Sequence, residues 1–221
     1  MKDEMDLIID YPSNIASFLI NDRIDIGLVP IAVIPSLKEH HIISDYGIGC
    51  DGEVASVCLF SEVPLAEIET ILLDYQSSTS SALLKILLEE HWKISPQIVS
   101  GTDNYEKQIT GTTAGLVIGD RALRQRLRSK YFYDLGSAWK EMTGLPFVFA
   151  AWVSNKKLPA AFIAAFNEAN EFGLNNLDEV IRQNPHSVFD LKRYYTELVK
   201  FKLDSQMHAA KALFLRKINK K

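Results

Sequence analysis

The pattern of apolar and polar positions changes from strand type to helix type between Ile68 and Trp92. Residues 68–75 form a short run rich in isoleucine and leucine, which is typical of a buried strand in a parallel sheet. From Leu83 onward, leucines recur at helical spacing and the charged residues fall outside that stripe. The segment therefore predicts a strand, a short turn and a helix that ends near Trp92.

Hydroxyl side chains fill the turn between this strand and this helix, at Ser77, Ser78, Thr79 and Ser80. A helix N-terminus presents unpaired N–H groups and the positive end of the helix dipole, so it attracts anions. Helix capping explains one hydroxyl but not four in succession. We therefore interpret Ser77, Thr79 and Ser80 as a cradle for a small carboxylate. A phosphate is less favoured because no Gly-rich loop or adjacent lysine is present.

The remaining apolar runs predict a chain in which strands and helices alternate. Strands are expected at residues 6–10, 26–30, 41–44, 54–61, 94–99, 114–119, 131–135 and 147–153. Helices are expected after Pro12 and after the strands at 114–119 and 131–135, and everything beyond Pro159 reads as helical. The glycine-containing stretch at 45–53 reads as a loop.

This alternation predicts an α/β fold with parallel sheets. Residues 65–145 contain enough strands and helices for an inserted middle lobe, and residues 1–64 and 146–221 would form a discontinuous outer lobe. The strands at 54–61 and 147–153 would then cross between the lobes. We expect a two-lobe clamp of the periplasmic-binding-protein type II kind. Its central cleft would hold the site, where strand C-termini and helix N-termini meet.

The first predicted strand, at residues 6–10, has almost nothing before it. A sheet of this kind normally carries an opening strand, loop and helix, which need about 20–30 further residues. We therefore expect this chain to be an N-terminally shortened form that is weakly stable and poorly active, with a natural product that starts upstream of Met1.

Composition and charge narrow the function classes. The 221 residues are 47% hydrophobic and 24% charged, as in an ordinary soluble globular protein. The net charge of −4 gives no basic surface for nucleic acid. No apolar run approaches the roughly 20 residues that span a bilayer, and the N-terminus lacks a signal-peptide core. Cys50 and Cys58 lie in or beside apolar sequence without zinc-site spacing, so we expect a reduced, cytoplasmic protein.

Few residues outside the hydroxyl turn suggest a catalytic or binding role. Each of the five histidines lies where a surface or structural role is the simpler interpretation. Gly119 and Asp120 end a strand and begin a helix, which would put them at the cleft, although a helix cap is the simpler interpretation of Asp120. Ser56 lies in a predicted crossing strand and faces either the ligand or the core. No nucleophile elbow, phosphate-binding loop, dinucleotide fingerprint or metal-ligand pattern occurs.

The residues alone thus predict a clamp for a small anionic molecule and leave three classes open. An extracytoplasmic solute-binding protein would need a signal peptide, which the sequence does not show. An effector-sensing regulator would need a helix-turn-helix and a basic surface. A cofactorless enzyme is the third class.

Five segments together resemble one family: DIGLVPI at 25–31, SVCLFS at 56–61, LLDYQSSTS at 72–80, VIGDRAL at 117–123, and DLGSAWKEMTGLPFVFAAW at 134–152. They resemble, in order and over nearly the whole chain, the chorismate dehydratases of the futalosine route to menaquinone. That family is related to type II periplasmic binding proteins. Its sister enzyme, which acts on dehypoxanthine futalosine, shares the fold and some motifs and is the alternative, together with a non-catalytic binding module for a small carboxylate.

The resemblance implies that chorismate, a small dicarboxylate, is dehydrated to 3-[(1-carboxyvinyl)oxy]benzoate without a metal or redox cofactor. The proton lost from C3 is vinylogous to the ring carboxylate, so donors on that carboxylate would stabilise the transition state.

Two departures from the family stand out. Ser78 occupies the place of a family arginine. The family's Ser-Tyr-Leu-Asn, whose asparagine is assigned to the reacting centre, has no counterpart before Asp6, so that asparagine is expected upstream of Met1. The catalytic residue is therefore unassigned, as is the second carboxylate site.

Overall fold

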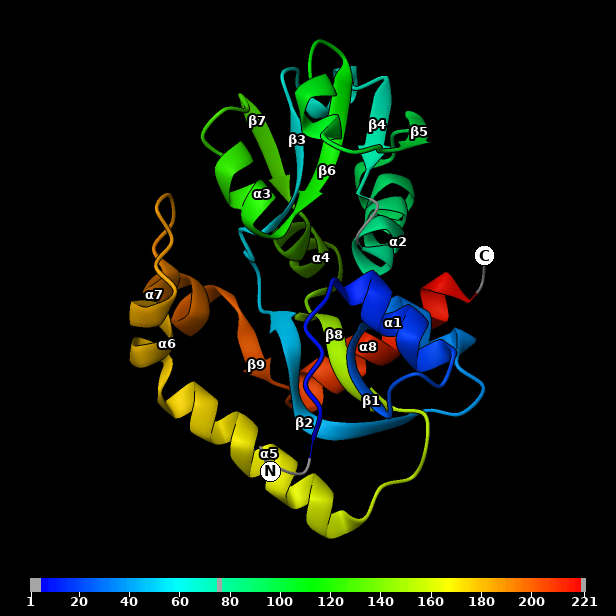
Figure 1. Ribbon diagram of the computed structural model, residues 1–221. Helices are drawn as coiled ribbons and strands as arrows, with labels where there is room; N and C mark the ends of the chain where they lie inside the picture. Colours follow the sequence, from blue (N-terminus) through cyan, green and yellow to red (C-terminus); the bar gives the residue numbers. More distant parts are fainter. Residues whose placement is uncertain (1–4, 75–76, 220–221) are drawn as a thin grey trace.

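Two β-sheets organise the computed structural model, which describes residues 5–74 and 77–219 (Figure 1). The first is antiparallel throughout, in the order β1-β8-β2-β9. Its strands are β1 (Ile26–Pro30), β8 (Phe147–Ser154), β2 (His41–Cys50) and β9 (Lys200–Lys202).

The second sheet has five strands in the order β5-β4-β6-β3-β7 and mixes both pairings. Its strands are β5 (Gln97–Ser100), β4 (Thr70–Leu73), β6 (Thr113–Ile118), β3 (Val57–Ser61) and β7 (Tyr131–Asp134). Strands β5, β4 and β6 are parallel, whereas β3 is antiparallel to both β6 and β7. The predicted α/β class with two lobes is thus confirmed, but only one sheet has parallel pairs.

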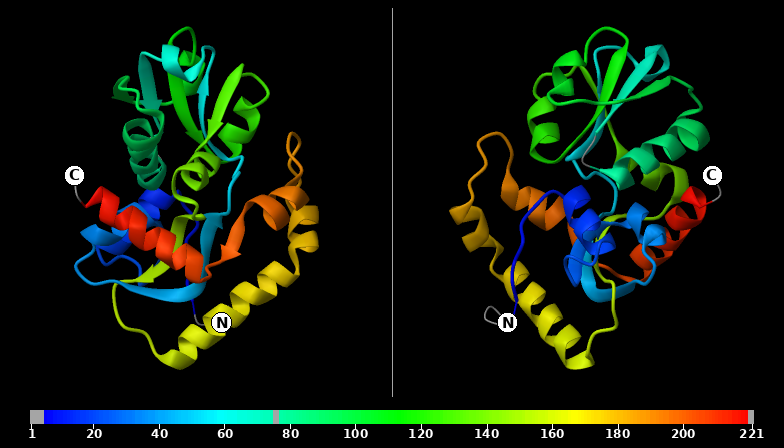
Figure 2. Two further views of the ribbon diagram at one scale, coloured as in Figure 1. Left: turned by 180° about the vertical axis from the view of Figure 1, so that it is seen from behind. Right: turned by 45° about the vertical axis from the view of Figure 1, so that its right-hand side comes forward.

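Helices join and cover the two sheets. The α-helices are α1 (Pro12–Ile20), α2 (Ser78–Ile86), α3 (Gly119–Gln125), α4 (Leu135–Thr143), α5 (Ala160–Asn175), α6 (Leu177–Gln183), α7 (Leu191–Arg193) and α8 (Ser205–Ile218). Shorter turns are η2 (Ile31–Ser36), η3 (Leu65–Glu67), η4 (Leu87–Trp92), η5 (Tyr105–Gln108) and η6 (Tyr194–Leu198). Helix α8 lies across the four-stranded sheet, and α5 to α7 form an arm along its edge (Figure 2). No helix of the described chain is long and apolar enough to span a membrane.

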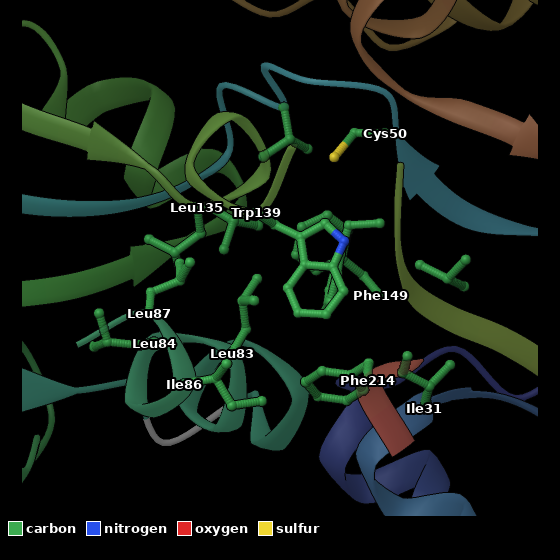
Figure 3. Packing of buried hydrophobic residues seen from close by; sticks show 14 of the residues in the cluster. Ile31, Cys50, Leu83, Leu84, Ile86, Leu87, Leu135, Trp139, Phe149 and Phe214 are labelled. Carbon is green, nitrogen blue, oxygen red and sulfur yellow. The ribbon is translucent and has the colours of Figure 1, made fainter. Parts of the chain in front are cut away.

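A continuous apolar core joins the two lobes. Leu83 of α2 points toward Trp139 of α4, Leu87 of η4 lies beside Leu135, and Trp139 also lies beside Phe214 of α8 (Figure 3). The Trp139 and Phe147 rings are 5.2 Å apart in an edge-on arrangement that is favourable for aromatic pairs. The helices between the sheets therefore belong to one core and hold the lobes against each other.

Three expectations about the strands were wrong. Residues 6–10 are irregular, with Leu7 and Ile9 81% and 87% exposed, and no described strand pairs with them. Residues 45–50 are strand, not loop: a Cβ at Gly47 would lie 2.6 Å from the Ala150 carbonyl oxygen. The glycine therefore permits close strand packing instead of a turn.

The third wrong expectation was an all-helical C-terminal region. Strand β9 interrupts it and pairs with Tyr46 and Gly49 of β2. Its sequence, Lys-Phe-Lys, is too short for a period-2 pattern to be recognised.

Candidate functional site

The ends of three strands place most of the predicted site residues along one edge of the five-stranded sheet. Strands β4 and β6 are parallel, so Asp74 and Gly119 follow them at the same edge. Strand β3 runs the opposite way and Val57 pairs with Ile118, so Ser56 enters at that edge too. With neighbouring strands about 4.8 Å apart, the three positions fall within roughly 10 Å along the sheet edge.

The hydroxyl turn after β4 is bonded within the protein. Ser77 caps α2: its Oγ accepts from the Ser80 amide at 3.2 Å and donates to Ser80 Oγ at 2.9 Å. Thr79 is buried, and its Oγ1 accepts from the amide of Ala32 in η2, at the end of β1, at 3.2 Å. Capping thus explains Ser77, while Thr79 connects the α2 N-terminus to the other lobe. Whether these groups bind a carboxylate stays a prediction.

Ser56, Gly119 and Asp120 lie together beside Tyr194, the first residue of η6. The Gly119 amide donates to the Ser56 carbonyl at 2.8 Å, and Ser56 Oγ is 2.7 Å from the hydroxyl of Tyr194. Burial raises the pKa of Tyr194 to about 12, the hydrogen bond shared with Ser56 opposes this, and Tyr195 and Asp120 add smaller upward shifts. Tyr194 is therefore a neutral phenol at neutral pH, able to donate or accept one hydrogen bond.

Asp120 does not cap α3. The cap position is Ile118, and exposed Asp120 lies in the first helical turn, where its charge complements the helix dipole. Gly119 has a φ of +62° at the start of that helix, a conformation that glycine adopts without strain.

A buried ionic network lies beneath the hydroxyl turn. The Asp74 side chain has no exposed surface, and it accepts from Arg121 Nη2 at 2.7 Å and from the Tyr105 hydroxyl at 2.8 Å. Arg121 also donates to Glu106 at 2.8 Å. Burial, with the neighbouring Asp74 charge, raises the pKa of the Tyr105 phenol. The network fixes the end of β4, from which the chain proceeds to α2.

A second network holds the passage between the sheets. The Asp134 carboxylate accepts from the amides of Val54 and Ala55 at 3.2 and 2.7 Å, and it caps α4 through Ser137. Ala55 has a φ of +62°, which costs energy for a residue with a Cβ, so the surrounding bonds must maintain it. Burial raises the pKa of Asp134, and the three amide bonds oppose that shift. Arg126 completes the network by bonding Glu53 at 2.7 Å.

Sequence reasoning missed these supporting residues, namely Asp74, Tyr105, Arg121, Arg126, Asp134 and Tyr194. One signal was available for the acids, because an aspartate follows an apolar run and precedes a helix in both LLD and FYD. Tyr194 carries no such signal, since its contact with Ser56 spans 138 positions of the chain. Among the described residues, no group of three or more histidine, cysteine, aspartate or glutamate side chains could hold a metal ion.

The expected catalytic asparagine would precede the first residue of this chain. Met1 lies outside the described residues, which begin at Met5. The expectation of a Ser-Tyr-Leu-Asn segment upstream of Met1 therefore stays a prediction, as does the upstream start itself. The described residues that follow, 5–11, are irregular and exposed. The catalytic residue accordingly stays unassigned.

Solved structures share the two-lobe architecture. Protein AF1704 from Archaeoglobus fulgidus has a TM-score of 0.72 at 15% identity, covering 96% of this chain and 84% of that one. An ABC transporter from Parabacteroides distasonis has a TM-score of 0.62 at 16% identity, covering 97% and 81%. The periplasmic aliphatic sulphonate binding protein SsuA from Escherichia coli has a TM-score of 0.56 at 13% identity, covering 95% and 79%. These likenesses confirm a fold of the periplasmic-binding-protein kind.

Sequence relatives carry a more specific name. A chorismate dehydratase from Thermus thermophilus is 30% identical over 164 residues, which cover 63% of this chain but only 58% of that protein. A chorismate dehydratase from Campylobacter jejuni subsp. jejuni is 27% identical over 210 residues, covering 93% and 80%. The family model described as menaquinone biosynthesis matches residues 1–220. The chain therefore belongs to the menaquinone biosynthesis family.

Proposed function

We propose that this protein dehydrates chorismate to 3-[(1-carboxyvinyl)oxy]benzoate, a step of the futalosine route to menaquinone. The observation that carries the proposal is the family match over residues 1–220, together with relatives named chorismate dehydratase. The sheet-edge arrangement of Ser56, Gly119 and the α2 N-terminus supports it, because strand C-termini and helix N-termini are where α/β folds bind small anions.

The chemistry requires stabilisation of negative charge that develops as C3 loses its proton. That charge spreads through the neighbouring double bond into the ring carboxylate. Donors fixed around the carboxylate before reaction would gain strength in the transition state. In the proposed site, the backbone amides that open α2 and the hydroxyls of Ser77, Thr79 and Ser80 supply those donors. The reaction is a lyase elimination that, as proposed, uses no cofactor and takes place in the cytoplasm.

Thr79 has a further consequence for how such a site would work. Its Oγ1 accepts the Ala32 amide of the opposite lobe. A carboxylate that entered between α2 and η2 would compete for that same amide. Substrate binding would then replace a bond between the lobes with two bonds to the ligand. The energetic cost of breaking the protein bond is small, about 1 kcal/mol.

The proposal is tested by incubating the purified 221-residue protein with chorismate and analysing the products by mass spectrometry and proton NMR. We expect slow formation of a product lighter than chorismate by one water, with the aromatic signals of a 3-substituted benzoate, because the asparagine assigned to the reacting centre is expected upstream of Met1. A parallel incubation with dehypoxanthine futalosine separates the sister activity. Turnover of that compound alone would contradict the proposal.

Replacing Thr79 and Ser80 together by alanine should weaken binding of the dehydration product by about tenfold, because hydroxyl donors to a carboxylate are lost. Calorimetric titration measures the affinity, and circular dichroism checks that the fold is retained. The matched control is Ser78→Ala, since Ser78 lies in the same turn but is exposed. Equal affinity in the double variant and the control would show that the hydroxyls of Thr79 and Ser80 do not bind the carboxylate.

A further inference from the structure

A surface pocket of about 240 Å³ lies on the outer lobe between β2, α5 and α8. It is lined by Ile42, Ile43, Ser44, Asp45, Ile163, Asn167, His208 and Lys211. These β2 residues are near the start of the strand, whereas its other end, Cys50, leads into the passage toward Ser56. The pocket is therefore separate from the candidate site for chorismate and does not depend on the proposed reaction.

An interruption of the β2 ladder shapes one wall of this pocket. Ile42 pairs with Val153 and Gly47 with Ala151, so four residues of β2 face a single residue of β8. Asn167 of α5 holds this bulge: its Oδ1 accepts from Ser44 Oγ at 2.7 Å and from the Asp45 amide at 3.3 Å. Because both bonds use the oxygen, the NH₂ group of Asn167 remains available as a donor. Within the described chain that NH₂ has no acceptor.

Lys211 of α8 provides a positive charge on the side of the pocket formed by that helix. Lys211 is half-buried, and no described carboxylate lies within 4 Å of its Nζ, which is 3.5 Å from Nδ1 of His208. Burial lowers the pKa of Lys211, because the partly desolvated ammonium group has only a long hydrogen bond to the His208 ring and no described anion beside it. The acidic lining residue, Asp45, is exposed and makes no ion pair with it. A bound anion would restore the missing compensation.

Apolar side chains complete the lining and set the shape of a ligand. Ile42, Ile43 and Ile163 offer branched aliphatic surface beside the polar groups. The volume of about 240 Å³ corresponds to roughly eight water molecules. That volume has room for a molecule with one charged group and a short hydrocarbon body.

We propose that this pocket is a binding site for a small aliphatic carboxylate. The carboxylate would accept from Lys211 Nζ and the NH₂ of Asn167, and its branched hydrocarbon would contact the three isoleucines. The ligand would then connect β2, α5 and α8, which meet here from distant parts of the chain.

The test uses 3-methylbutanoate as the probe, titrated into the ¹⁵N-labelled 221-residue protein and followed by amide chemical shifts. We expect saturable shifts at residues 43–46 and around Asn167 and Lys211. Lys211→Met should weaken binding by about tenfold or more, because a charge-assisted bond is lost. Lys211→Arg should restore most of the affinity. Arg216→Met, which removes an exposed charge from the same helix, should leave affinity within about twofold.

Three results would overturn the proposal. Equal affinity for the uncharged analogue 3-methylbutan-1-ol would show that the pocket recognises only the hydrocarbon and not the carboxylate. Shifts centred on the α2 N-terminus would place the acid in the candidate chorismate site instead. Absence of saturation up to about 10 mM would mean that the pocket has no useful affinity. None of these measurements depends on dehydration of chorismate. Failure of the proposed reaction and failure of the pocket proposal can therefore be told apart.

Discussion

Replacing Asp134 by alanine should lower the free energy of unfolding by about 3–5 kcal/mol, from a lost helix cap and unpaired buried amides. The Asp134 carboxylate is the acceptor for the amides of Val54, Ala55 and Ser137. Val54 and Ala55 are fully buried, so water cannot readily replace the carboxylate. Urea unfolding followed by circular dichroism measures the change.

The same substitution should also affect the relation between the lobes. Ala55 keeps its positive φ in the passage between the sheets, and Asp134 bonds its amide directly. Asp51→Ala is the matched control, because Asp51 lies in the same passage but forms a surface pair with Lys140 at 2.7 Å. Such an exposed pair contributes about 0–1 kcal/mol. If both variants lost the same stability, the passage would not depend on the buried carboxylate.

Arg121→Met should lower the free energy of unfolding by about 3 kcal/mol, because it removes the cation beside a buried carboxylate. Asp74 would keep the hydroxyl of Tyr105 but lose the guanidinium at 2.7 Å. Methionine retains the length and helix propensity of the arginine, so the effect reports on charge more than on packing. Chemical denaturation at neutral pH provides the measurement.

Arg124→Met serves as the control for this variant. Arg124 is exposed on the same helix, α3, so its loss should change stability by less than about 0.5 kcal/mol. Restoration of stability in the double variant Arg121→Met with Asp74→Leu would assign the loss to the uncompensated charge. If the double variant were less stable than Arg121→Met alone, the buried pair would not be the cause.

The strand-turn-helix pattern around residues 68–92 was predicted correctly because both periodicities are local. Ile71 and Leu72 are buried in β4, and Leu83, Leu84 and Leu87 are buried on one side of α2 and η4. Burial of an apolar stripe against any core suffices to produce this pattern, whatever the partner elements are. The two-lobe α/β class follows from several such segments in succession.

The sequence could not predict which strands are neighbours. Strands β2 and β8 pair across about a hundred residues, and the glycines of β2 looked like turn residues because close backbone approach leaves no local signal. Strand β9 exists only because the free side of β2 offers it hydrogen-bond partners. Pairing between distant segments is set by the whole fold, so composition within a window cannot show it.

The features of the candidate site also separate into those that the sequence predicted and those that only the tertiary structure determined. By itself the sequence identified hydroxyls at a helix start, glycine and aspartate at a strand end, and a series of motifs that names a family. The tertiary structure alone brought Tyr194 to Ser56, placed Thr79 against Ala32 of the other lobe and buried Asp74 with Arg121. Helix starts and strand ends are local events set by a few neighbouring residues. Contacts between lobes depend on how two sheets pack around Trp139, and that is decided only when the whole core forms.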